Sequence, residues 1–323
     1  MRKAFAIIAV FSIIIVLSFL MLLIPKSSSR ESITGRHIVG LIKEDSFDYT
    51  VLFCSQDDCS QEIESRIKGS RITECAMYNF NQRLLDAGVN RTLRIITDSS
   101  YKEENQFIRK RNKSGLMHNK FCIFDGKTII TGSFNPSSSK NDRNNMIIIN
   151  STNLARNYES EFEELWSGKY GGGTKNPNTR MELNETLVEN YFCPEDKCAD
   201  MVEDAISKAN KSIRFMAYSF THKGIANEIV IKNMSGVSVK GIIDSSSDKD
   251  AYEPMNNLGV DARIDRKKGV MHQKVFIIDG ETVITGSFNP TYSADDKNDE
   301  NLLIIHDKAV ASKYLEEFER VWG

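Results

Sequence analysis

Two histidines of this chain stand in the same short sequence context. Each context holds a histidine, a lysine, an aspartate and a Gly-Ser-Phe-Asn-Pro segment at the same spacing: His118, Lys120, Asp125 and 132–136 in the first copy, and His272, Lys274, Asp279 and 286–290 in the second. Paired imidazoles and ammonium groups suit the two-step cleavage of a phosphodiester. One imidazole attacks phosphorus, the other protonates the leaving oxygen, and the cations hold the phosphate charge.

The repeated pattern H-x-K-x4-D-x6-G-S-x-N resembles the HKD motif of the phospholipase D superfamily. The segments around it are duplicated too, from about residue 48 onward. Two intact copies at one spacing are more specific than a single short motif. Since the superfamily includes phospholipases, phospholipid synthases and nucleases, the resemblance indicates the reaction class better than the substrate. It also implies one active site built from both motifs of a single chain, without an obligate dimer or a cofactor.

The resemblance further implies a role for each motif residue. One histidine forms a phosphohistidine intermediate, and the other protonates the leaving alcohol and then activates water. In members with two motifs the first histidine is commonly the nucleophile, so we expect His118 to attack and His272 to act as the acid. Lys120 and Lys274 neutralise the phosphate oxygens without a metal ion. The polar residues of the two Gly-Ser-Phe-Asn-Pro segments are expected to bind the phosphate or to support the site: Ser133, Asn135, Ser287 and Asn289.

The resemblance counts the two aspartates of the motif among the catalytic residues, but they also have a second interpretation. Asp125 and Asp279 each precede a glycine between two apolar runs, which is a turn signal in a β-hairpin. We therefore favour a bracing role for both over a chemical one.

One position differs between the two copies. The second copy has Asn298-Asp299-Glu300-Asn301, similar to the N-x-E-N segment of the family, and Glu300 is expected to orient a catalytic imidazole and to favour its charged form. In the first copy Asn144 stands in place of the glutamate. An amide can orient an imidazole but adds no charge, so the two histidines are expected to differ in basicity.

Six cysteines are present, and four of them form two matching Cys-x4-Cys pairs. We predict the disulfides Cys54–Cys59 and Cys193–Cys198 rather than metal sites or free thiols. Zinc sites usually have tighter spacing and clustered histidines, and the position of each pair between a strand and a helix suits a small disulfide. These disulfides indicate an oxidising, extracytoplasmic location. The other two cysteines, Cys75 and Cys122, have no such pattern and are expected to be buried, free and structural.

The N-terminus carries a long apolar segment. After a short tail at 1–3, residues 4–24 contain no charged residue, and this length is enough for a membrane-spanning helix. We interpret the segment as an uncleaved signal-anchor rather than a cleaved signal peptide. It makes the membrane an expected partner and places the protein there as a single-pass protein, with a polar stalk at 25–48.

Strand-like and helical segments alternate within each copy, which predicts an α/β fold. We expect a first repeat at 49–168, a linker at 169–186 and a second repeat at 187–323. Each repeat is predicted to be an α/β/α sandwich with a mixed sheet, and the two are expected to be related by a pseudo-two-fold axis. The end of a helix and a strand are expected at 256–264 in the second copy alone.

Charge gives a weaker indication of the substrate. The formal net charge of −2 does not suggest a protein that holds nucleic acid by bulk positive charge. Basic residues nevertheless precede each histidine, at 109–113 and 263–268, and are either solvated or arranged around the pocket. We therefore expect a membrane-anchored hydrolase of phospholipid phosphodiester bonds. The alternatives are a nuclease, a phosphatidyltransferase of the cardiolipin synthase kind and a binding module without catalysis.

Overall fold

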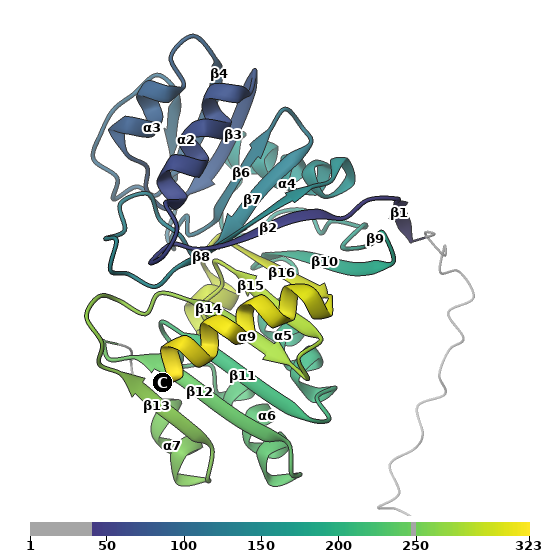
Figure 1. The fold of residues 1–323 in the computed structure, drawn as a ribbon. Coiled ribbons are helices and arrows are strands. Elements are labelled where there is room, and N and C mark those ends of the chain that lie inside the picture. The colour runs from purple at the N-terminus through teal and green to yellow at the C-terminus, as the bar shows by residue number, and fades with distance from the viewer. Residues whose placement is uncertain (1–40, 247–249) are drawn as a thin grey trace, which may run out of the picture. The chain divides into compact units, whose positions relative to one another are not determined.

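Two β-sheets, each built mainly from one copy of the repeat, pack against each other through a shared core (Figure 1). The computed structural model describes residues 41–246 and 250–323. Sheet one has seven strands in the order β2-β8-β7-β6-β3-β4-β5, and sheet two has nine in the order β1-β9-β10-β16-β15-β14-β11-β12-β13. Both contain parallel and antiparallel pairs, as predicted for a mixed α/β fold.

The first copy runs through sheet one and ends in a long helix. Its elements are β2 (Asp48–Phe53), α2 (Cys59–Gly69), β3 (Ile72–Met77), α3 (Gln82–Ala87), β4 (Thr92–Thr97), β5 (Ile108–Lys110), β6 (Lys120–Phe124), β7 (Thr128–Gly132), β8 (Asn145–Asn150) and α4 (Thr152–Trp166).

The second copy repeats this order with additions. Its elements are β10 (Thr186–Cys193), α5 (Cys198–Ser207), β11 (Ser212–Ala217), α6 (Lys223–Met234), β12 (Ser238–Asp244), α7 (Tyr252–Asn257), β13 (Asp261–Asp265), β14 (Lys274–Ile278), β15 (Thr282–Gly286), α8 (Tyr292–Asp296), β16 (Glu300–His306) and α9 (Lys308–Trp322). The helices α7 and α8 have no counterpart in the first copy among the described residues.

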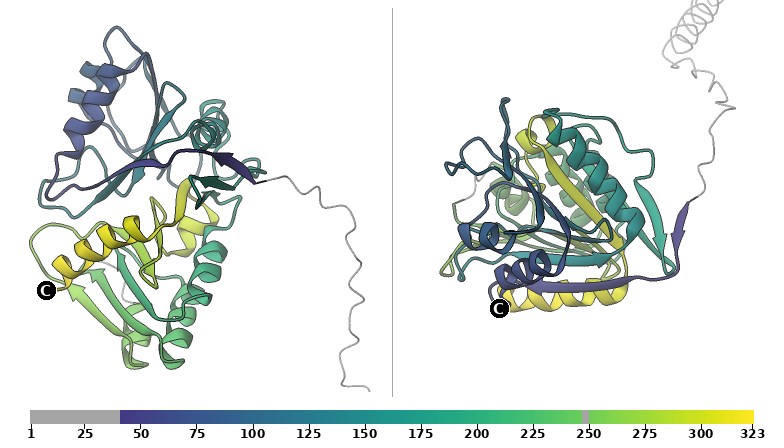
Figure 2. Two further views of the ribbon diagram at one scale, coloured as in Figure 1. Left: turned by 45° about the vertical axis from the view of Figure 1, so that its right-hand side comes forward. Right: turned by 90° about the horizontal axis from the view of Figure 1, so that it is seen from above.

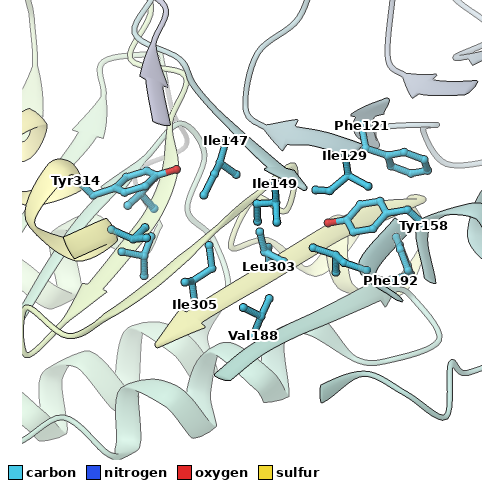
Figure 3. Packing of buried hydrophobic residues seen from close by; sticks show 14 of the residues in the cluster. Phe121, Ile129, Ile147, Ile149, Tyr158, Val188, Phe192, Leu303, Ile305 and Tyr314 are labelled. Carbon is cyan, nitrogen blue, oxygen red and sulfur yellow. The ribbon is translucent and has the colours of Figure 1, made fainter. Parts of the chain in front are cut away.

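The core between the sheets follows from the alternation of side chains along the strands. In β8, Ile147 and Ile149 point into the shared core, whereas Met146 and Ile148 point to the opposite face, toward α2 and α3. In β16, Leu303 and Ile305 meet Ile147 and Ile149 in the shared core (Figure 3). Because these strands are covered on both faces, they read as continuous apolar runs.

The long helices α4 and α9 also belong to the shared core. Ser151 and Asp307 cap their N-termini, each accepting a hydrogen bond from a backbone N–H three residues on. Tyr158 of α4 and Tyr314 of α9 are fully buried in the cluster between the sheets. Of the shorter helices, α2 and α3 lie at one end of the molecule and α6 and α7 at the other (Figures 1 and 2).

Three sequence expectations about the elements need correction. The predicted stalk contains a strand, β1 (Ile42–Glu44), and the predicted linker contains another, β9 (Arg180–Leu183). These two strands pair in parallel. The strand expected in the second copy alone also has a counterpart in the first, β5, which pairs with β4 as β13 pairs with β12. These strands lie at or near sheet edges, where a short segment with little apolar character suffices.

The cysteines differ from expectation at one pair. The disulfides Cys54–Cys59 and Cys193–Cys198 are present, but Cys75 and Cys122 are bonded to each other rather than free. Cys75 and Cys122 are direct partners across the antiparallel strands β3 and β6, with Cα atoms 4.1 Å apart. Register between strands far apart in sequence cannot be read from cysteine spacing, and that is why the prediction was wrong.

The predicted membrane anchor at 4–24 and most of the predicted stalk lie outside the described residues. Within 41–246 and 250–323, no helix has the length and apolar character needed to cross a bilayer.

Candidate active site

Both motif histidines open onto one pocket of about 600 Å³ where the two copies meet. His118 lies two residues before β6, and His272 lies two residues before β14. The pocket is lined by residues of both copies: Tyr78, Leu116, His118, Asn135, Tyr218, Ser219, Thr221, His272, Asn289, Thr291, Ser293 and Asn298. The structure therefore brings the two motifs together within one chain.

Backbone hydrogen bonds between the copies hold the two histidine segments in place. The N–H of His118 donates to the carbonyl of Asp299 at 2.9 Å, and the N–H of His272 donates to the carbonyl of Arg143 at 3.0 Å. Asp299 and Arg143 occupy equivalent positions in the two repeats, so the arrangement has pseudo-two-fold symmetry. Each histidine is thus held at the start of a strand of the other copy: His118 at β16 and His272 at β8.

His118 is oriented by a carboxylate from the other copy. Its Nδ1 lies 2.7 Å from Oε2 of Glu300, and the same oxygen accepts a hydrogen bond from Ser287 Oγ at 2.6 Å. Burial raises the pKa of Glu300, but the contacts with His118, with Lys120 and with Ser287 outweigh it, and the pKa is lowered. Glu300 is therefore ionised and accepts the proton on Nδ1, which leaves Nε2 of neutral His118 with its lone pair free.

His272 has neutral partners instead. Its Nδ1 lies 2.9 Å from Oδ1 of Asn144 and 3.0 Å from the carbonyl oxygen of Ser133, both of the first copy. Burial lowers the pKa of His272 well below the usual value, and the neighbouring Lys274 and Lys120 lower it further. Burial also lowers the pKa of His118, but there Glu300 opposes the effect. The expected difference in basicity therefore follows from the partner of each ring.

The two lysines are buried next to the histidines. The Nζ of Lys120 donates to the carbonyl of His118 at 2.9 Å, and the Nζ of Lys274 donates to the carbonyl of His272 at 2.8 Å. Burial lowers the pKa of Lys120 to about 7, with Glu300 opposing, and lowers the pKa of Lys274 well below its usual value. An anion bound in the pocket would stabilise the charged form of both.

Two tyrosines support these groups and were not singled out from the sequence. The ring of Tyr78 meets the ring of His118 with centroids 5.7 Å apart, and Tyr218 meets His272 at 4.7 Å. Each also lies near a lysine, with 5.9 Å from Lys120 Nζ to the Tyr78 centroid and 5.0 Å from Lys274 Nζ to that of Tyr218. Their equivalent positions after β3 and β11 were the available signal.

The serines and asparagines of the Gly-Ser-Phe-Asn-Pro segments have separate places. Ser133 Oγ donates to Asn144 Oδ1 at 3.1 Å, and Ser287 bonds to Glu300 as described, so both serines hold the partners of the histidines. Asn135 and Asn289 line the pocket. The Oδ1 of each is buried without a hydrogen-bond partner among the described residues. The serines thus brace the site, while the asparagines remain able to contact a ligand.

The aspartates of the motif lie at the far ends of β6 and β14 from the histidines. Asp125 accepts hydrogen bonds from the N–H groups of Arg71 and Ile72, both at 2.9 Å. Asp279 accepts from the backbone N–H groups of residues 210–212. The φ angles of 51° and 57° fit turn positions that Asp tolerates. Their inclusion among the catalytic residues is therefore wrong, and the bracing role agrees with the structure.

Most of the first basic run makes contacts within the chain. The Cζ of Arg109 lies 4.0 Å from the centroid of the Trp166 ring, Lys110 pairs with Glu104, and Arg111 is fully buried against Asp299. In the second run the Cζ of Arg263 lies 3.7 Å from the centroid of the Trp322 ring, whereas residues 266–268 are exposed at the surface. The basic runs therefore contribute less free charge to the pocket surroundings than their sequence suggests.

No group of three or more His, Cys, Asp or Glu residues is placed to hold a metal ion in the described ranges 41–246 and 250–323. The prediction of a metal-free site stays a prediction.

Comparison with known proteins identifies the family. A family profile described as "Cardiolipin synthase, PLD-like domain" matches residues 49–166 and 202–322, which is more than half of the chain and covers both copies. This chain belongs to the phospholipase D superfamily. It is a phosphodiesterase of the hydrolase class.

Individual relatives match only part of this phospholipase D superfamily chain. A phospholipase D of Rickettsia prowazekii (strain Madrid E) is 37% identical over 138 residues, which are 42% of this chain and 67% of the relative. A mitochondrial cardiolipin hydrolase of Xenopus laevis is 33% identical over 150 residues, covering 42% of this chain and 71% of the relative. The crystal structure of phosphatidylserine synthase from Haemophilus influenzae Rd KW20 has a TM-score of 0.62 over 87% of both chains at 12% identity, a likeness of fold.

Proposed function

We propose that this chain hydrolyses phospholipid phosphodiester bonds at a membrane through a phosphohistidine intermediate. The observation that carries the proposal is the unequal pair of imidazoles on one pocket, where His118 is bonded to the carboxylate Glu300 and His272 to the amide Asn144. The two rings are thereby prepared for different tasks in one reaction.

In the first step, Nε2 of neutral His118 attacks phosphorus and the bond from phosphorus to the leaving oxygen breaks. His272, protonated on Nε2, gives that proton to the leaving alcohol. The ammonium groups of Lys120 and Lys274 stabilise the charge on the non-bridging oxygens. The products of this step are the free alcohol, the phosphohistidine and neutral His272.

In the second step, His272 takes a proton from water, and the water oxygen attacks phosphorus. The bond between nitrogen and phosphorus then breaks, which releases the phosphomonoester and restores neutral His118 and protonated His272. The lysines supply the positive charge that the reaction needs, so the proposal includes no metal ion.

The partners of the rings favour His118 as the nucleophile. A phosphorylated imidazole that keeps its proton on Nδ1 is cationic, and the carboxylate of Glu300 stabilises this cation. Asn144 gives His272 no such stabilisation, which makes protonated His272 a strong acid. Binding of the phosphate anion promotes protonation of His272, because it offsets the charge of the nearby lysines.

A lipid substrate is supported by the names of the relatives and by the surface around the pocket. The relatives quoted above are named phospholipase D and cardiolipin hydrolase. Leu116 lines the pocket and is 40% exposed, Val270 lies two residues before His272, and Tyr292 lies between two lining residues. Val270 and Tyr292 are exposed as well. Apolar side chains beside a catalytic pocket suit contact with a bilayer better than contact with a nucleic acid backbone.

The pocket lining also suggests which headgroup leaves. None of the described residues that line the pocket is an aspartate or a glutamate, so a cationic headgroup such as choline finds no counter-charge there. Ser219, Thr221 and Ser293 of the second copy, which also carries the proposed acid His272, line the pocket with hydroxyl groups. We therefore propose an uncharged polyhydroxyl alcohol, of the glycerol or inositol kind, as the leaving group.

Residues 4–24 and the disulfides support a location at the outer side of a membrane. An apolar segment of that length would keep the pocket close to lipid, and the disulfide pairs suit an oxidising compartment. The anchor and the extracytoplasmic orientation are part of the proposal.

The test uses the full chain in detergent, mixed in chelator with vesicles of phosphatidylglycerol, phosphatidylinositol or phosphatidylcholine, and in parallel with single-stranded DNA and RNA. The His118→Ala protein is the control for contaminating activity. We expect headgroup release from phosphatidylglycerol or phosphatidylinositol at least ~10-fold faster than from phosphatidylcholine, because one unpaired charge in a pocket costs more than 1.4 kcal/mol.

Each result bears on a separate part of the proposal. Faster release from phosphatidylcholine would refute the headgroup assignment while leaving the lipid hydrolase in place. Cleavage of DNA or RNA with intact vesicles, lost in the His118→Ala protein, would refute the lipid substrate. Loss of all activity in chelator, restored by a divalent cation, would refute the metal-free mechanism.

A further inference from the structure

Two buried ion pairs join the copies beside the active site. Equivalent positions in the two copies carry opposite charges in these pairs. The guanidinium of Arg111 in the first copy donates to Asp299 in the second, and that of Arg143 in the first copy donates to Asp265 in the second. All four side chains are at least nine-tenths buried. The first copy supplies both cations and the second copy both anions.

The four residues occupy only two positions of the repeat. Arg111 and Asp265 each lie seven residues before the motif histidine, and Arg143 and Asp299 each follow the residue that begins the N-x-E-N-like segment. The backbone confirms this equivalence, because His118 bonds to the carbonyl of Asp299 as His272 bonds to that of Arg143. The two ion pairs are thus the same contact made twice by the pseudo-two-fold, with the sign exchanged.

Part of the apolar contact between the copies is symmetric. Ile147 and Tyr158 of the first copy have Leu303 and Tyr314 as their counterparts in the second, and all four lie in the shared core. Matched apolar side chains of this kind do not by themselves distinguish the other copy from the same copy of a second chain. None of the three disulfides joins the copies either, since each closes within one repeat.

We infer that the charge-reversed ion pairs direct the first copy to pair with the second and prevent each copy from pairing with its own kind in another molecule. If two first copies met in the same geometry, Arg111 would face Arg143. If two second copies met, Asp265 would face Asp299. Like charges buried against each other are strongly unfavourable, whereas both unlike pairings are satisfied.

The selected pairing is also the one that builds the site described above. Two first copies would place His118 beside Asn144, and two second copies would place His272 beside Glu300. Only the unlike pairing gives His118 its carboxylate and His272 its amide. The ion pairs themselves do not depend on the proposed substrate or mechanism, so this inference stands apart from the proposed function.

The test exchanges charges while keeping both ion pairs within the chain. In the double variant Arg143→Asp with Asp265→Arg, each copy carries one cation and one anion. The unlike pairing stays satisfied, but pairing between like copies becomes satisfied too. The matching double variant at the other contact is Arg111→Asp with Asp299→Arg. The quadruple variant combines all four changes, so that the first copy is all anionic here and like copies repel again.

The full chain of each variant is unfolded in denaturant with its disulfides intact, refolded at high protein concentration and measured by light scattering after size-exclusion chromatography. We expect the wild type and the quadruple variant to be monomers of one mass. The two double variants are expected to shift to species of twice that mass or more, through exchange of copies between chains. Phosphodiesterase activity of any remaining monomer shows whether it is folded.

The pattern across variants decides the outcome. Double variants that remain monomers like the wild type would overturn the inference. It would equally be overturned if the quadruple variant formed multimers or aggregates like the doubles, because charge exchange would then disturb the fold irrespective of sign. Multimers or aggregates in the doubles together with a monomeric quadruple variant would support it.

Discussion

The difference between Glu300 and Asn144 predicts the effect of giving His272 a carboxylate. Oδ1 of Asn144 lies 2.9 Å from Nδ1 of His272, and Nδ2 of Asn144 is buried without a hydrogen-bond partner among the described residues. Asn144→Asp is close to isosteric and removes no hydrogen bond of that amide nitrogen. The nearby Lys274 and Lys120 reduce the cost of burying the new charge.

The expected rise in the pKa of His272 follows from the geometry. A carboxylate in direct contact raises the pKa of a histidine by about 1–3 units, and we expect about 1–2 here because the two lysines also interact with the new charge. One unit corresponds to about 1.4 kcal/mol in favour of the imidazolium. An NMR titration of imidazole-labelled protein measures this shift directly, and Asn144→Ala serves as the control that removes the partner without adding charge.

Whether Asn144→Asp raises or lowers kcat/KM depends on the role of His272. The active state needs neutral His118 and protonated His272, and the pKa of His272 lies below that of His118, because Glu300 opposes the effect of burial only for His118. Each unit by which the pKa of His272 rises therefore increases the population of this state about tenfold. A weaker acid transfers its proton less readily, so a net gain in kcat/KM of about threefold per unit is expected near neutral pH.

Two results would refute this reasoning. If the pKa of His272 shifted by less than about 0.3 units in a folded Asn144→Asp protein, the assignment of its electrostatic environment would be wrong. If the pKa rose as expected but kcat/KM fell in proportion, His272 would be the nucleophile, since a nucleophile must be neutral. The roles of His118 and His272 would then have to be exchanged.

Three further outcomes are expected. Glu300→Gln should lower kcat about 10²–10⁴-fold, because an amide no longer fixes the tautomer of His118; a loss below about fivefold would contradict the orienting role. Asp279→Ala should lower the free energy of unfolding by about 1–3 kcal/mol, because three hydrogen bonds from backbone N–H groups are lost, while kcat stays unchanged; a matching fall in kcat at full stability would restore its chemical role. Replacing Cys75 and Cys122 by Ala should lower the unfolding free energy by about 4 kcal/mol in chemical denaturation, because their sequence separation is 47. An effect no larger than that of the disulfides with a separation of 5 would contradict the loop-closure argument.

The disulfide between β3 and β6 illustrates where sequence reasoning about the fold reaches its limit. The hairpin of β6 and β7, the strand β8 and the helix α4 were all predictable, because each is defined by an apolar period and a local turn or cap. Pairing of β3 with β6 is a contact between segments that are distant along the chain. In the second copy the equivalent place holds the stacked rings of Phe215 and Phe276 instead.

The site shows the same division. The motif histidines and lysines were predictable because their duplication makes chance agreement improbable. The role of the aspartates could be narrowed by the Asp-Gly turn signal. The tyrosines beside the histidines were not singled out as site residues, because their equivalent positions after β3 and β11 reveal the repeat but not a contact with the histidines. Tyr78 and Tyr218 acquire their role only through the packing of the ring against His118 and His272.

The sequence by itself determined the reaction class, the two motifs and the unequal residues Glu300 and Asn144, because residue types and their spacing can be read directly along the chain. Which histidine receives which partner was decided only by the tertiary structure. The pseudo-two-fold crosses the copies, so Glu300 of the second copy reaches His118 and Asn144 of the first reaches His272. That crossing depends on how two sheets pack against each other, and it brings together residues more than a hundred positions apart along the chain.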